Sequence, residues 1–153
     1  MLWNEIDKII KIEDMEWVST LPNYQQETVK NLLYNQTPEE AAIVWLTSTT
    51  QNTSPFSAKK TDSSSYFTAI KNEFNKLLCG NPEYEEERKE INGILASENN
   101  KTLLVSSISA LIGAKVGLVA SFVAPVTIFI LMTVSKMSIN AWCEMQDNGD
   151  VST

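Results

Sequence analysis

The feature that most restricts this chain is a long apolar stretch near its C-terminal end. Residues 103–134 carry a single charge, on Lys115, and residues 116–134 carry none. A helix on the surface of a protein keeps one polar face toward water, and this stretch has no such face. The stretch therefore predicts a helix that either crosses a lipid bilayer or forms the centre of a helical bundle.

Length alone does not choose between these two environments. About twenty apolar residues span the hydrocarbon core of a bilayer, and residues 116–135 supply that many. The Ser, Thr and Gly residues of the stretch, together with Pro125, count against a helix that faces lipid. A chain of 153 residues is also long enough to wrap one central helix with amphipathic ones. Both interpretations stay open.

The residues before the apolar stretch predict short helices. Apolar side chains recur at helical spacing in five segments, namely residues 2–13, 23–34, 38–46, 65–79 and 82–97. No segment shows the period-two alternation that is typical of a half-buried strand. The sequence thus predicts an all-α fold, with five short amphipathic helices followed by a very apolar helical hairpin that is kinked at Pro125.

The clearest local signal lies at the start of the third helix. Thr37 supplies an N-cap hydroxyl, Pro38 takes the first helical position, and Glu40 stands three residues after the cap. This spacing is a capping box, in which the threonine and glutamate side chains each bind a backbone N–H group of the other residue. A second local signal is Gly80, which predicts a left-handed helix end before the next helix begins at Asn81-Pro82.

Charge and hydropathy divide the chain into three parts. Residues 1–98 hold sixteen Asp and Glu against nine Lys and Arg, and we expect an acidic helical module there. Residues 101–145 form the apolar hairpin, and residues 146–153 form a polar tail. Within the module, the polar residues 47–65 predict a flexible loop. An ordered loop that binds a partner and is anchored by Phe56 is the other interpretation.

The hairpin itself divides at a glycine. We expect one helix over residues 101–114, a bend near Gly117 and a longer helix over residues 118–143. Pro125 lies inside the second helix, where a proline removes one backbone hydrogen bond and acts as a hinge.

Small residues recur at every fourth position of the hairpin and predict close approach of two helix backbones. Such stripes pack helices in membranes, where the hydrophobic effect does not drive association. The same spacing also suits tight packing inside a soluble bundle. The candidate residues for helix packing or oligomerisation are Ser109, Gly113, Gly117, Ala120 and Ala124.

Three further residues are candidates for a membrane interface. Lys115 and Lys136 flank the uncharged stretch, and a lysine in that position extends its ammonium group toward the lipid headgroups. Trp142 follows at the depth where tryptophan is enriched in membrane proteins. In a bundle, by contrast, Trp142 would belong to the core near the chain end.

Composition excludes several kinds of chemistry. The chain has no histidine, which removes nucleophile systems that depend on histidine and HExxH zinc sites. There is no glycine-rich phosphate loop, and the acidic clusters lack the spacing of a calcium loop, so we expect solvated helix faces, no metal and no cofactor. The net charge of −7 argues against binding to nucleic acid. We therefore expect a protein that is not an enzyme.

The cysteines and the N-terminus bear on the compartment. Cys79 and Cys143 are sixty-four positions apart and form no CxxC pair. We expect two reduced, mostly buried thiols in a cytoplasmic protein, and a disulfide is the other interpretation. The first residues, MLWNEIDKII, do not have the pattern of a secretory signal, so we expect the N-terminal module in the cytoplasm. The hairpin is then expected either in the inner membrane or in the cytoplasm.

Two blocks and the end of the hairpin carry a family resemblance. TPEEAAIVWL at 37–46 and LLCGNPEYEEERKEI at 77–91, followed by NAWCE at 140–144, resemble a group of small helical bacterial proteins. Some of these are associated with conflict or phage-defence gene neighbourhoods. The resemblance implies a multi-component bacterial system, and it carries over no catalytic residue.

Two functional classes remain from the sequence. In the first, the apolar hairpin inserts into the membrane or anchors the chain there, as an effector or accessory of a defence system. In the second, the chain is a soluble helical accessory subunit whose apolar helix is buried in its own core or in an oligomer interface. Both classes imply a protein partner or self-association.

Overall fold

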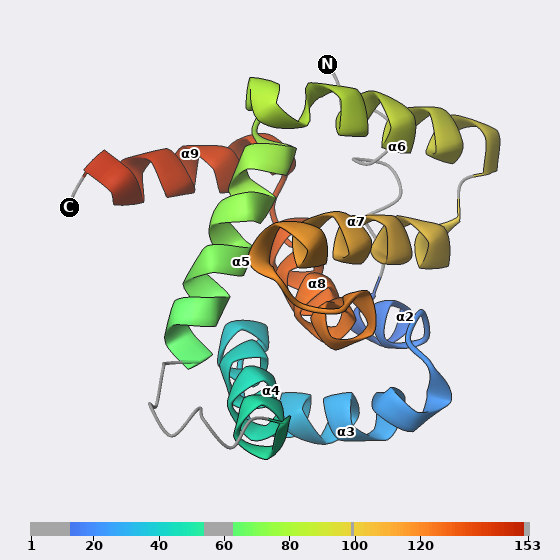
Figure 1. Cartoon of the computed structure of the whole chain (residues 1–153), viewed down its shortest axis with the longest axis vertical. Coiled ribbons are helices and arrows are strands. Elements are labelled where there is room, and N and C mark those ends of the chain that lie inside the picture. Colours follow the sequence, from blue (N-terminus) through green and yellow to red (C-terminus); the bar gives the residue numbers. More distant parts are fainter. Residues whose placement is uncertain (1–12, 54–62, 99, 152–153) are drawn as a thin grey trace.

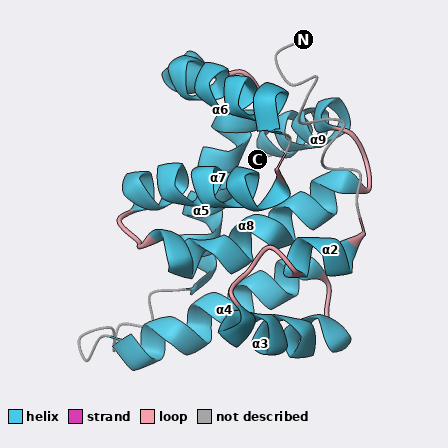
Figure 2. Ribbon diagram, turned by 90° about the vertical axis from the view of Figure 1, so that its right-hand side faces the viewer, coloured by secondary structure: helices cyan, strands magenta, loops and turns pink. Residues whose placement is uncertain are grey.

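The computed structural model describes residues 13–53, 63–98 and 100–151, and every regular element in these ranges is helical (Figures 1 and 2). This confirms the predicted all-α class. In chain order the elements are α2 (Asp14–Val18), α3 (Asn23–Tyr34), α4 (Pro38–Thr53), α5 (Ser63–Leu78), the 3-10 turn η1 (Pro82–Tyr84), α6 (Glu85–Glu98), α7 (Lys101–Val116), α8 (Ala120–Ser135) and α9 (Ile139–Val151). The helix expected over residues 2–13 lies almost wholly outside the described residues.

The predicted capping box begins α4. The backbone N–H of Glu40 donates to Thr37 Oγ1 at 3.1 Å, and the backbone N–H of Thr37 donates to Glu40 Oε1 at 3.0 Å. Two of the N–H groups that a helix start leaves unpaired are thereby satisfied.

The boundaries expected for the polar loop 47–65 are wrong. Helix α4 continues to Thr53 and α5 already begins at Ser63, so the ends of this segment are helical. Once a helix has formed, each further residue adds one hydrogen bond, and the polar residues after Leu46 include neither Gly nor Pro until Pro55. Residues 54–62, which include Phe56, lie outside the described residues.

The turn between α5 and η1 forms as predicted. Gly80 has φ +88°, the left-handed conformation that glycine adopts without strain. Asn81 then caps η1, because its side chain accepts a hydrogen bond from the backbone N–H of Glu83 at 2.8 Å.

The hairpin contains three helices where two were expected. Helix α7 reaches Val116, and the chain bends by 114° between α7 and α8. The long helix expected over residues 118–143 is wrong, because α8 ends at Ser135 and α9 begins at Ile139. Ser138 explains the second start, since its Oγ accepts the backbone N–H of Ala141 at 3.1 Å and competes with continuation of α8.

Helix α8 lies at the centre of the molecule. It packs against α7 most extensively, then against α4, α2 and α9 (Figure 1). Ten of its sixteen residues are buried, and they run almost without interruption from Val123 to Val134. Helices α2 and α4 of the acidic half and helices α7 and α9 of the apolar tail all contribute to this burial, so the two parts share one hydrophobic core.

Candidate functional site

Helix α8 is joined to its neighbours by hydrogen bonds as well as by apolar contacts. Pro125 has no N–H, so the carbonyl oxygen of Ser121, four residues earlier, has no donor within the helix. Gln25 on α3 donates its Nε2–H to that oxygen at 2.9 Å. Trp45 on α4 donates its Nε1–H to the next carbonyl oxygen, that of Phe122, also at 2.9 Å. Two surrounding helices thus complete the hydrogen bonding beside the proline.

The predicted hinge residue therefore has a definite environment. Pro125 is buried, and α8 is assigned as one continuous helix from Ala120 to Ser135 that passes through it. Sequence reasoning found the proline but missed Gln25 and Trp45. The available signal was the proline itself, because it leaves a carbonyl oxygen four residues earlier without its helical donor, and that oxygen is free to accept a hydrogen bond from another group.

Two of the predicted packing residues lie between α7 and α8. Ser109 is buried, and its Oγ is 2.9 Å from Thr127 Oγ1, which is also buried, so each hydroxyl supplies the partner that the other needs. Gly113 is buried at the end of α7, where a Cβ atom would stand 2.5 Å from the carbonyl oxygen of Leu118. These residues make contacts within the chain.

The other small residues occupy different surroundings. Gly117 is exposed and has φ +82°, so it serves as the left-handed end of α7. Ala120 and Ala124 are half-buried near the start of α8, and Ala124 packs against the core. The five predicted residues therefore do not form one exposed stripe.

Lys115 belongs to a charged cluster that joins α7 to η1. Its Nζ lies 3.0 Å from Glu83 and 5.4 Å from the ring centroid of Tyr84. Glu83 also pairs with Lys76 of α5 at 3.5 Å. The hydrogen bond from Lys115 and the charge of Lys76 lower the pKa of the Glu83 carboxyl. The carboxylates of Glu73 and Glu83 raise the pKa of Lys76.

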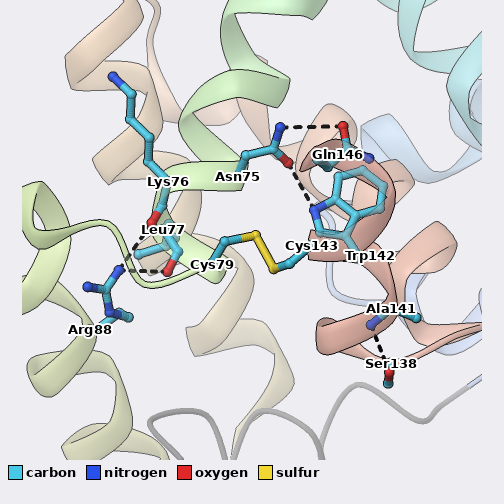
Figure 3. Close-up of a disulfide and its surroundings, with 10 residues drawn as sticks. All are labelled: Asn75, Lys76, Leu77, Cys79, Arg88, Ser138, Ala141, Trp142, Cys143 and Gln146. Atoms are coloured by element: carbon cyan, nitrogen blue, oxygen red, sulfur yellow. Dashed lines mark hydrogen bonds between the residues drawn. A yellow bond between two sulfur atoms is a disulfide. The ribbon is translucent and has the colours of Figure 1, made fainter. Parts of the chain in front are cut away.

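The remaining membrane-interface candidates lie apart from Lys115. Lys136 is exposed, and its Nζ is 3.5 Å from Asp14 on α2. Trp142 is only 4% exposed and donates its Nε1–H to Asn75 Oδ1 at 3.0 Å (Figure 3). Trp142 is thus a core residue, as the bundle interpretation expected.

The two cysteines form a disulfide, which corrects the expectation of reduced and buried thiols. Cys79 follows the last residue of α5 and is exposed, while Cys143 lies in the second turn of α9 and is half-buried (Figure 3). The bond closes a loop across a sequence separation of 64 residues. Chain-entropy reasoning for a loop of that length gives about 4 kcal/mol of stabilisation.

Arg88 is a buried charged side chain that sequence reasoning missed. It is 2% exposed, and its guanidinium donates to the carbonyl oxygens of Lys76 and Leu77 at 3.1 and 2.9 Å (Figure 3). It also donates to the carbonyl oxygen of Asn81 at 2.6 Å. These carbonyls lie at the end of α5 and just beyond it, where the helix dipole is negative and favours a cation. Positions 84, 88 and 91 lie at the spacing of one helix face, and this spacing could have indicated that Arg88 is buried together with Tyr84 and Ile91.

Within the described ranges, no three Cys, Asp or Glu side chains lie close enough together to hold a metal ion. A small hollow lies beneath Trp142, and its lining residues are Glu39, Phe67, Phe129, Ile130, Thr133 and Trp142. As for membranes, no one helix of the described chain is long and apolar enough to span a bilayer, whereas α7 and α8 satisfy the length and hydropathy criteria jointly, as a bent pair.

Comparison of the chain with models of protein families, with curated proteins and with solved structures yields no match.

Proposed function

We propose that this protein is a non-enzymatic, all-helical interaction protein in which α8 serves as the core of its own fold. The burial of α8 by its own chain carries the proposal. The donors that Gln25 and Trp45 supply to α8 add to it. Side chains from α3 and α4 make these two bonds, so they depend on the bundle around α8 and not on lipid.

The surface offered to a partner is the outer face of α6. Glu85, Glu86 and Glu90 are exposed there, while the charge of Arg88 is directed inward to backbone carbonyls. Lys89, the other cation of this helix, lies 3.9 Å from Glu85. The face is therefore strongly acidic, and the partner that it fits is a protein with a basic surface. Such an association weakens as salt concentration rises.

The first experiment asks where the full-length chain resides after lysis without detergent. The proposal expects the protein in the supernatant as a monodisperse species on size exclusion with light scattering. Retention in carbonate-washed membranes would contradict it.

The second experiment tests the acidic face of α6. A tagged full chain is used to capture proteins from a bacterial lysate at low and at high salt. Glu86→Lys reverses a charge on α6, and Glu27→Lys reverses an exposed charge on α3 as the matched control. We expect a salt-sensitive basic protein that Glu86→Lys loses and Glu27→Lys retains. Equal capture by the two variants would remove α6 from the proposal.

A second candidate function is insertion of the α7–α8 pair into a membrane. The observation that favours it is the joint length and hydropathy of α7 and α8. Insertion would require the pair to leave α4 and α5, which pack against it. The resemblance to proteins of defence neighbourhoods suits either function, as an effector for the membrane candidate or as an accessory subunit for the soluble one. Fractionation separates them.

A further inference from the structure

One of the two cysteines of the disulfide is an exposed residue. Cys79 is exposed at the end of α5, and only Cys143 is partly covered. Thiol–disulfide exchange requires a thiolate to approach one sulfur atom, and its rate depends on that access. The exposed Cys79 provides the point of attack.

The non-covalent contacts that hold α9 gather around the same bond. Asn75 on α5 accepts the Nε1–H of Trp142 and donates to Gln146 Oε1 at 3.4 Å (Figure 3). Lys71 on α5 places its Nζ 5.7 Å from the centroid of a Trp142 ring. These partners on α9 lie within one turn of Cys143. Beyond them α9 extends away from the rest of the bundle (Figure 1).

Helix α9 covers apolar side chains at this position. Trp142 lines the hollow together with Phe67 of α5 and Phe129 and Ile130 of α8. Removal of α9 would uncover these side chains and leave the other contacts of α8 with α4 and α7 in place.

We propose that Cys79–Cys143 is a thiol–disulfide exchange site that latches α9 over the core, and that its substrate is a dithiol reductant. One thiolate of the dithiol attacks Sγ of Cys79, forms a mixed disulfide and releases the thiolate of Cys143. The second thiol of the dithiol then attacks the mixed disulfide and releases Cys79. Two electrons pass to the cysteines, the dithiol leaves as its disulfide, and the two thiol protons end on Cys79 and Cys143.

Reduction changes how α9 is held. Without the covalent bond, α9 is held by the hydrogen bonds of Asn75 with Trp142 and Gln146 and by the apolar packing of Ile139 and Trp142. Because local opening follows the number of contacts that hold a segment, α9 should then open more often than the core. The inference does not depend on the proposed function.

The test uses the oxidised full-length chain and dithiothreitol at neutral pH, without denaturant. Mass spectrometry after alkylation counts free thiols, and hydrogen exchange compares the amides of α9 with those of α8. We expect two thiols to appear while the chain stays folded. The α9 amides should then exchange at least tenfold faster than in the oxidised chain, and faster than the α8 amides of the same reduced chain. Appearance of thiols only on unfolding, or equal protection of α9 and α8 after reduction, would overturn the proposal.

Two variants control this experiment. Cys79→Ser/Cys143→Ser should show fast exchange in α9 whether or not dithiothreitol is present. Met145→Ala, an exposed position on α9, should keep the response of the unaltered chain. If the double variant does not fold, the Met145→Ala protein and the unaltered chain still report the effect of reduction, and loss of the response in Met145→Ala would count against the latch.

Discussion

Helices α8 and α9 follow one another in the chain, yet different forces hold them in the fold. Helix α8 is surrounded, with ten buried residues and two carbonyl oxygens that accept hydrogen bonds from α3 and α4. Helix α9 contacts fewer elements and is joined to α5 by a disulfide. Burial and hydrogen bonds to neighbouring helices hold α8 in position, whereas a covalent bond supplements a small contact patch for α9.

The two helices also differ in how readily each can open. A buried helix opens only when the whole bundle opens, while a helix at the edge opens locally with a smaller free energy. The disulfide stabilises the folded chain because it restricts the conformations open to the unfolded chain. Four sets of variants, taken from the largest expected effect to the smallest, test how the fold is held together.

The largest effect is expected in the core of α8. Phe129→Ala should reduce the free energy of unfolding by about 3–5 kcal/mol, because it removes a large apolar side chain and leaves a cavity. Chemical denaturation measures the change. Tyr34→Ala removes an aromatic ring that is 84% exposed and should change stability by less than about 0.5 kcal/mol. Similar losses in the two variants would show that α8 is not the core.

The second effect concerns the latch of α9. Cys79→Ser/Cys143→Ser should reduce the free energy of unfolding by about 2–4 kcal/mol, because the unfolded chain regains the freedom that the closed loop denied it. The reduced form of the unaltered chain should show the same loss in denaturation. A change under about 0.5 kcal/mol would mean that the bond contributes nothing to the fold.

The third effect tests the hydrogen bond beside Pro125. Gln25→Ala should cost about 0.5–1.5 kcal/mol, because the carbonyl oxygen of Ser121 loses its donor. In a Pro125→Ala background the helix can supply its own N–H, so the cost of Gln25→Ala should fall. A double-mutant cycle measures this coupling. Additive losses would show that Gln25 does not compensate for the proline.

The smallest effect is electrostatic and depends on pH. The pKa of Glu83 is lowered in the folded chain, mainly by its hydrogen bond with Lys115. Its contribution to stability is therefore present above the pKa of an unfolded glutamic acid, about 4.3, and is lost as the pH falls through the lower folded value. At pH 7 the melting temperature of Glu83→Gln should be lower than that of the unaltered chain, and the two melting temperatures should converge as the pH falls. A gap that stays constant with pH would argue against this origin.

The sequence predicted those parts of the fold that depend on neighbouring residues. The capping box at Thr37 and the left-handed Gly80 are local, and the structure confirms both. The break between α8 and α9 was missed, because Ser138 is a modest cap signal next to a long apolar run. The C-terminal end of α4 was predicted too early, because polar residues without a Gly or Pro among them do not end a helix.

The candidate site was harder to predict because it depends on contacts between distant segments. Spacing showed that Cys79 and Cys143 form no local pair, but only the packing of α9 on α5 brings them together. The small residues at Ser109 and Gly113 indicated close packing, and the structure places that packing inside the chain. A stripe of small residues carries no information on whether the partner helix belongs to the same chain.

Native-state hydrogen exchange of α8 in detergent-free buffer tests whether this helix is the core of the protein. The account predicts that the amides of residues 126–134 exchange only through global unfolding and are among the slowest in the chain. Rapid exchange of these amides in a chain that is monodisperse only with detergent would contradict it and favour the bilayer for α7 and α8.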